Sequence, residues 1–206
     1  AELYTRRGEP AHALDYAGRA LAVSMYDPEA NFVYGVAARR LGRLVDAKET
    51  LGWAARSPQF EAVALVQSAE IAVQEKDYDR ASEYALRALV SDDLNVNALE
   101  VLAVAHRLAG RKSEVKRVLG WLGEVDPLDH LARFERYLGS REPADLEACR
   151  ALIRNELPHE TWLEMASFYA RLGLDADAAA ALKAAPEQTT VLYTLAYLLR
   201  DSAPAE

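Results

Sequence analysis

The feature that most constrains this chain is a period of 34 residues in the placement of its small side chains. The repeated tracks are Ala13, Ala47, Ala81 and Val115; Gly8, Gly42, Lys76 and Gly110; Ala20, Ala54, Ala88 and Leu122; and Ala1, Gly35, Ala69 and Ala103. Small residues at fixed offsets in such a period are typical of helix-turn-helix units, none of which can bury its apolar face alone. We therefore expect an all-α solenoid without strands, a right-handed superhelix of antiparallel helix pairs with a curved groove. We expect Ala47, Ala54, Ala81 and Ala88 to be buried where helices approach closely.

The period predicts one array of units across residues 1–206. We expect a partial unit over 1–27, full units over 28–61, 62–95 and 96–129, a shortened unit over 130–158, a unit over 159–188 and a partial one over 189–206. The pattern predicts about thirteen helices, including helices over 2–7, 10–25, 128–138, 144–155 and 190–200. Because the chain starts in the middle of a helical pattern, we expect it to be a piece of a longer protein.

The residues of the repeat resemble the tetratricopeptide repeat family, whose consensus places aromatic and small residues at set offsets in 34. The best match is late in the chain, at Trp162, Met165, Ala166, Tyr169, Gly173, Ala178, Leu182 and Ala185. The resemblance covers essentially the whole chain. It implies a non-catalytic scaffold that binds a protein or peptide through its concave groove.

A second resemblance leads to an alternative function. The runs over 126–138 and 154–165 resemble the C-terminal repeats of large bacterial proteins, whose N-terminal parts resemble carbohydrate-related, β-rich domains. This resemblance implies a structural arm that docks on a neighbouring domain of the same polypeptide. The sequence that precedes Ala1 in the full gene would separate the two functions.

The tetratricopeptide resemblance also implies which residues line the groove, because the first helix of each unit does so in that family. The groove residues carried over are Phe32, Val36, Arg39, Arg40, Val66, Glu70, Gln74, Asn97, Glu100, Val104, Arg107, Phe134, Ser167 and Arg171. The lysine and asparagine clamp that some members use for a terminal carboxylate is absent. Its offsets hold Phe32, Val36, Gln67, Asn97 and Val101.

The arginines of this set have two interpretations. Arg6, Arg40 and Arg171 share one offset near a helix C-terminus, and Arg107 lies one residue earlier. Cations at this place complement the helix dipole and solubilise the surface. Alternatively, they form a row that faces an acidic ligand.

The charge of the chain disfavours two classes of partner. A net charge of −8 argues against nucleic acid, because phosphate neutralisation needs clustered lysine and arginine. It argues equally against a polybasic membrane contact, and no apolar run approaches the roughly 20 residues of a membrane helix. Cys149 is the only cysteine, so there is no internal disulfide; the compartment stays open, with a reducing cytoplasm favoured.

Motifs for chemistry are incomplete in this chain. His159-Glu160 opens a zinc-protease pattern, but Leu163 stands where the second histidine ligand is required. His106 occupies an offset that is buried between helices, which favours a core histidine. We therefore expect no catalytic residues, no metal and no cofactor.

Two further short runs have separate interpretations, and the turn between helices accounts for the glycine of the first. Residues 110–113 read GRKS but lack the glycine frame of a phosphate loop. Residues 133–137 read RFERY, which fits either an arginine–aromatic contact within a bend or an exposed contact patch.

The helix predicted over residues 190–200 has apolar residues on several sides and no partner helix after it. A solenoid needs polar caps because each unit normally covers its neighbour. We expect this helix to mediate self-association through residues such as Leu195 and Leu199, or to pack deeply on the preceding unit.

Overall fold

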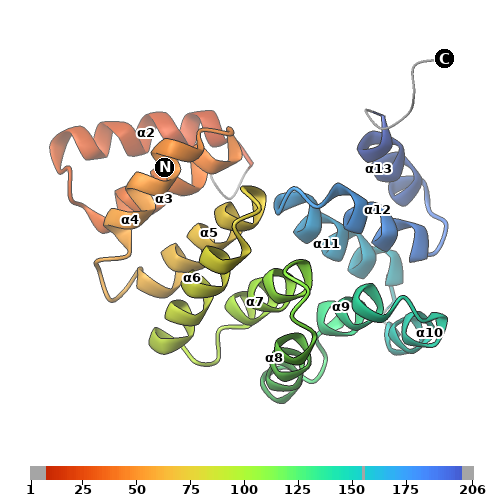
Figure 1. Cartoon of the computed structure of the whole chain (residues 1–206). Helices are drawn as coiled ribbons and strands as arrows, with labels where there is room; N and C mark the ends of the chain where they lie inside the picture. Colours follow the sequence, from red (N-terminus) through yellow and green to blue (C-terminus); the bar gives the residue numbers. More distant parts are fainter. Residues whose placement is uncertain (1–7, 155, 201–206) are drawn as a thin grey trace. The chain divides into compact units, whose positions relative to one another are not determined.

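The computed structural model describes residues 8–154 and 156–200, and all the regular structure in this part of the chain is helical (Figure 1). The expectation of an all-α helical-repeat protein is confirmed. The chain divides into two compact units, residues 1–105 and 106–206, and each is described here by itself. The helix predicted over residues 2–7 lies outside the described residues.

Consecutive helices of each unit form hairpins. The first unit contains α2 (Pro10–Val23), α3 (Pro28–Arg40), α4 (Leu44–Ala54), α5 (Glu61–Gln74) and α6 (Tyr78–Ser91), and α7 (Val96–Leu108) crosses into the second. The second unit continues with α8 (Lys112–Val125), α9 (His130–Ser140), α10 (Pro143–Leu152), α11 (Pro158–Arg171), α12 (Asp175–Ala184) and α13 (Thr189–Leu199). Extensive packing joins α3 with α4, α5 with α6, α9 with α10, and α11 with α12.

Residues of the glycine track, and Gly173 beyond it, occupy the turns of four hairpins. Gly42 and Gly110 both have φ 73°, and Gly173, after the shortened unit, has φ 71°. In each turn the next N–H reaches a carbonyl five residues back, at 2.9 Å, as in a Schellman motif. These bonds run from Arg43 to Ala38, from Asp77 to Ala72, from Arg111 to His106 and from Leu174 to Tyr169. Lys76 adopts the same conformation with φ 62°, which costs a non-glycine residue roughly 1–2 kcal/mol.

Side-chain caps define several helix starts. The carboxylates of Asp27, Asp77 and Asp129 accept hydrogen bonds from backbone N–H groups in the first turns of α3, α6 and α9. The side-chain oxygen of Asn95 accepts from the N–H of Ala98 at 3.0 Å at the start of α7. These caps satisfy donors that the helix itself leaves open.

The small-residue tracks lie at helix contacts in the middle of the array, whereas Ala20, which belongs to one of these tracks, is exposed. Ala47, Ala54, Ala81 and Ala88 are fully buried, which confirms that part of the repeat register. The helices also approach closely at Gly35, where an added Cβ would lie 2.6 Å from Cγ of the fully buried Leu51. Glycine therefore lets α3 and α4 come together at this point.

Aromatic packing forms the centre of the second unit. The ring of Phe134 on α9 lies 5.7 Å from that of Trp162 and 5.9 Å from that of Tyr169, both on α11, and both contacts are edge-on. All three side chains are almost completely removed from solvent. Edge-on ring pairs of this kind stabilise a core beyond the area that they bury.

The last described helix, α13, keeps much of its apolar surface in solvent. Val191 is buried against the unit, whereas Leu192, Tyr193 and Tyr197 are each more than half exposed. The helix is therefore not packed deeply on the preceding helices, as one alternative of the sequence analysis expected. The other alternative, self-association, stays a prediction. No helix in the described part of the chain is long and apolar enough to cross a membrane.

Replacing Gly35 by alanine should destabilise the first unit by about 1–3 kcal/mol, because the added methyl overpacks the contact with Leu51 and Thr50. Gly52 is the matched control, since it lies in α4 with no atom within 4 Å of an added Cβ. Gly52→Ala should instead stabilise the protein by about 0.5–1 kcal/mol by removing a helical glycine. Urea unfolding of both variants measures the difference. Equal effects would contradict the close approach at Gly35.

Candidate functional site

The predicted groove residues differ widely in their access to solvent. Those that are buried are Val36, Arg39, Val66, Glu70, Val104 and Phe134. Those that are half-buried are Phe32, Gln74, Glu100 and Arg107, and those that are exposed are Arg40, Asn97, Ser167 and Arg171. The second and third groups are accessible to solvent, whereas the first group is packed beneath the surface.

Two of the predicted groove residues of the first unit form a buried ion pair. Arg39 Nη1 on α3 lies 2.8 Å from Glu70 Oε2 on α5, and each side chain is less than 5% exposed. A charge this deeply buried needs a partner of opposite sign, because removing it from water costs several kcal/mol. The pair therefore joins the first helices of two successive hairpins.

A larger network of the same kind occupies the second unit. Arg107 at the end of α7 donates to both carboxylate oxygens of Glu135 on α9, at 2.7 and 3.1 Å. Its Nη2 also donates to Asp177 on α12 at 2.7 Å. Tyr169 on α11 donates its O–H to Glu135 at 2.7 Å. Four helices thus meet around one carboxylate that has no exposure to solvent.

The electrostatics of this network favour its charged form. Burial disfavours the cation of Arg107, but the charges and hydrogen bonds of Glu135 and then Asp177 outweigh burial and raise the pKa of Arg107 above its ordinary value. Burial and then the neighbouring Glu135 carboxylate raise the pKa of Tyr169 well above its usual range. Tyr169 accordingly stays a neutral donor at physiological pH.

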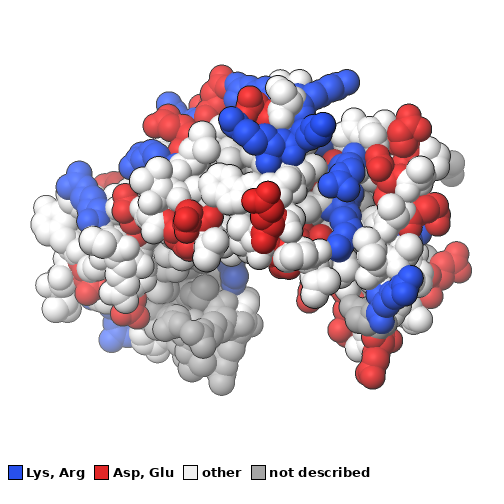
Figure 2. All heavy atoms as spheres, turned by 90° about the horizontal axis from the view of Figure 1, so that it is seen from below, with Lys and Arg blue, Asp and Glu red and all other residues white. Residues whose placement is uncertain are grey.

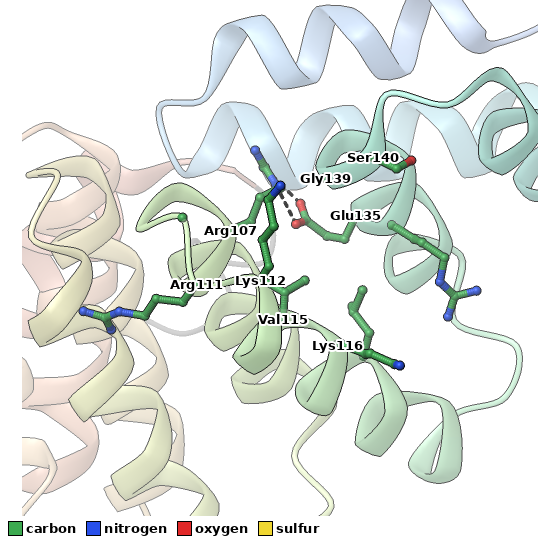
Figure 3. Close-up of a pocket in the computed structure, with 11 residues that line it drawn as sticks. Arg107, Arg111, Lys112, Val115, Lys116, Glu135, Gly139 and Ser140 are labelled. Atoms are coloured by element: carbon green, nitrogen blue, oxygen red, sulfur yellow. Dashed lines mark hydrogen bonds and ion pairs between the residues drawn. The ribbon is translucent and has the colours of Figure 1, made fainter.

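A pocket of about 510 Å³ opens beside this network, where the end of α7, the start of α8 and the end of α9 meet (Figure 3). Its lining residues are Arg107, Gly110, Arg111, Lys112, Val115, Lys116, Leu119, Glu135, Arg136, Gly139 and Ser140. Figure 3 shows Glu135 directed at Arg107, whereas Arg111 points away from Glu135. The pocket therefore has a neutralised side at Arg107 and a cationic side elsewhere.

The pocket brings together the two short runs over 110–113 and 133–137. Gly110, Arg111 and Lys112 come from the GRKS run, and Glu135 and Arg136 come from the RFERY run. Sequence reasoning from the groove offsets missed Lys112, Lys116 and Arg136, because two of them lie on the second helix of a hairpin and one in the shortened unit. The density of charge in both runs was the signal available.

The remaining candidates of the sequence fall into ordinary environments. His106 is buried, and burial followed by the charge of Arg111 lowers its pKa, so the ring is neutral at pH 7. Burial raises the pKa of the Cys149 thiol to about 11, which suppresses the reactive thiolate. The described residues contain no group of three or more histidine, cysteine or acidic side chains placed to hold a metal.

The predicted row of cations is spread over both units. Arg40 ends α3 in the first unit, and Arg107 and Arg171 belong to the second; Arg6 lies outside the described residues. Arg107 forms ion pairs with Glu135 and Asp177. This intramolecular role differs from the two interpretations of the sequence, which are complementation of the helix dipole and recognition of an acidic ligand. The guanidinium of Arg171 lies 5.3 Å from the centre of the Phe168 ring.

Comparison with known proteins supports the fold. The chain is similar to the crystal structure of a tetratricopeptide repeat protein from Parabacteroides merdae, with a TM-score of 0.65 and 17% sequence identity. The match covers 97% of this chain and 81% of that one. No family model matches the sequence, and no curated protein matches it. The protein therefore has a tetratricopeptide-type helical-repeat fold.

Replacing Glu135 by glutamine should destabilise the protein by about 3–5 kcal/mol, because it leaves Arg107 buried with half of its compensating charge. Tyr169→Phe removes one hydrogen bond to the same carboxylate and should cost less, about 1–3 kcal/mol. Thermal and urea unfolding measure both values.

Glu75→Gln is the matched control for this prediction. Glu75 pairs with Lys48 at 2.6 Å on the surface of the first unit, where an ion pair contributes less than about 1 kcal/mol. A Glu135→Gln variant as stable as Glu75→Gln would show that the buried network does not hold the second unit together.

Proposed function

We propose that this protein is a non-catalytic scaffold that binds a protein or peptide through the first helices of its repeats. The observation that carries the proposal is the combination of a helical-repeat fold with first helices whose outer residues remain accessible. On α3 and α5, Phe32, Arg40 and Gln74 are half-buried or exposed, while the Arg39–Glu70 pair beneath them holds the two helices together. Such a rigid, mixed surface suits side-chain recognition of an extended or helical segment.

Charge supports a protein partner rather than a nucleic acid. The chain carries a net charge of −8, and on the face drawn in Figure 2 lysines and arginines form patches between acidic side chains. Binding along a nucleic-acid backbone needs a continuous basic stripe, which this face does not have.

The proposal is tested by selecting peptides from a displayed random library on the full chain and measuring their affinity by fluorescence anisotropy. Arg40→Glu should weaken the selected peptides by about tenfold, since it reverses a charge on the proposed surface. Arg87→Glu makes the same change on the exposed face of α6, a second helix, and should leave the affinity unchanged. Equal affinities for Arg40→Glu and the unaltered chain would place the binding surface elsewhere.

The exposed apolar face of α13 favours a second role, association with another copy of the chain or docking on a neighbouring domain. Leu192, Tyr193 and Tyr197 together expose a contiguous amphipathic surface along one helix. Polar caps normally end a helical-repeat array, so this surface is atypical of a free end.

Light scattering of the purified chain tests this second role. We expect a dimer, and we expect Leu192→Glu with Tyr193→Glu to make it monomeric, because both side chains are exposed in the unit and are not needed for its core. Leu86→Glu with Val90→Glu on the exposed face of α6 is the matched control and should not change the mass. A monomeric starting protein would exclude self-association through α13.

A further inference from the structure

The pocket at the junction of α7, α8 and α9 is lined in part by apolar side chains and by a glycine. Val115 and Leu119 lie one turn apart on α8, and Gly139 on α9 presents no side chain. A Cβ added at Gly139 would meet no atom within 4 Å, so the space beside this glycine is open. The volume of about 510 Å³ lies within the range of small-molecule sites, roughly 300–1,000 Å³.

The rim of the pocket carries cations, in a chain that is acidic as a whole. Lys112 and Lys116 are one turn apart on α8, and Arg136 faces the pocket from α9. All three side chains are exposed, and the structure gives none of them an ion pair with a described residue. The one carboxylate of the lining, Glu135, is already engaged by Arg107 and Tyr169.

The start of α8 adds to this positive potential. Gly110, Arg111 and Lys112 line the pocket, and the N-cap residue of α8, Arg111, makes no capping hydrogen bond with its side chain. The first N–H groups of a helix carry a partial positive charge that favours anions. The Arg107–Glu135 pair links two of the residues that line the pocket.

From this juxtaposition we propose that the pocket binds an amphiphilic organic anion, whose acidic head meets Lys112, Lys116 and Arg136 and whose apolar body lies on Val115, Leu119 and Gly139. An acidic head alone would leave the apolar side unused, and an apolar body alone would leave three cations unpaired. A carboxylate and a phosphate share the chemistry that this rim recognises. The pocket shares Arg107 with the peptide-binding surface proposed for the first helices, whereas its cations Lys112, Lys116 and Arg136 are not among the proposed groove residues.

The probes are four molecules that separate the two halves of the ligand: octanoate, octyl phosphate, octanol and inorganic phosphate. Titration of the full chain is followed by the backbone amide signals of Gly110 and Gly139, which lie on different segments at the pocket. Octanoate and octyl phosphate should shift both signals at lower concentrations than octanol or inorganic phosphate. Tighter binding of octyl phosphate than of octanoate points to a phosphate head, and the reverse to a carboxylate.

Lys116→Glu with Arg136→Glu should weaken octyl phosphate by about tenfold or more, because two cations of the rim become anions. Arg87→Glu with Lys183→Glu makes the same change in net charge at exposed positions outside the pocket and should leave binding unaltered. Gly139→Leu should abolish binding by filling the apolar side, with Gly110 as the reporter. Gly123→Leu, at an exposed glycine of α8 with open space around it, is its control.

The proposal is overturned by any of three results. Equal shifts with octanol would show an apolar cavity without a head-group site. Equal affinity for inorganic and octyl phosphate would show an anion site without an apolar half. Equal loss of binding in the pocket variants and their controls would show that the ligand contacts another surface. Circular dichroism melts of all variants check that each keeps the fold.

Discussion

A charged side chain that is buried in the fold needs a partner of opposite charge. In this protein such buried ion pairs connect successive helical hairpins. Arg39 and Arg107 are both near the ends of first helices, and each finds a glutamate on the first helix of the next hairpin. In the second unit the glutamate is completely buried and also accepts from Tyr169. Apolar contacts tolerate different neighbours, whereas a buried charge needs partners of opposite charge or hydrogen-bonding groups at short distances. These buried pairs therefore define how neighbouring hairpins lie within each unit.

The network also explains why a pocket exists beside it. Glu135 is directed toward Arg107, and the end of α9 beyond it carries Gly139, which fills little space. Lys112, Lys116 and Arg136, which line the pocket from α8 and α9, form no ion pair with a described residue. A buried, satisfied charge and an exposed, cationic rim thus lie side by side. On α9, the buried Glu135 and the pocket residue Gly139 are one helical turn apart.

The helical termini show how local conformation and the repeat agree. Glycine at 42, 110 and 173 adopts the left-handed conformation at the end of the first helix of each hairpin, and Lys76 is forced into the same conformation by its place in the repeat. The hydrogen bond that closes the turn has the same length in the hairpins α3–α4, α5–α6, α7–α8 and α11–α12. At Arg141, in the shortened unit, a left-handed residue again ends a helix, although no glycine marks the position. Tertiary packing there overrides the preference of the residue.

The period of 34 by itself determined the helical pairs, the turns at the glycines and the burial of Ala47, Ala54, Ala81 and Ala88, because small residues and turn residues act locally and repeat with the backbone. The sequence also placed Arg39, Glu70 and Arg107 on first helices, as groove residues. Only the tertiary structure decided that these three side chains are paired within the units. The partners of Arg107 lie 28 and 70 residues away, across a unit whose shortening breaks the repeat register. The pocket likewise brings together the runs over 110–113 and 133–137, which the groove offsets of the sequence had not combined.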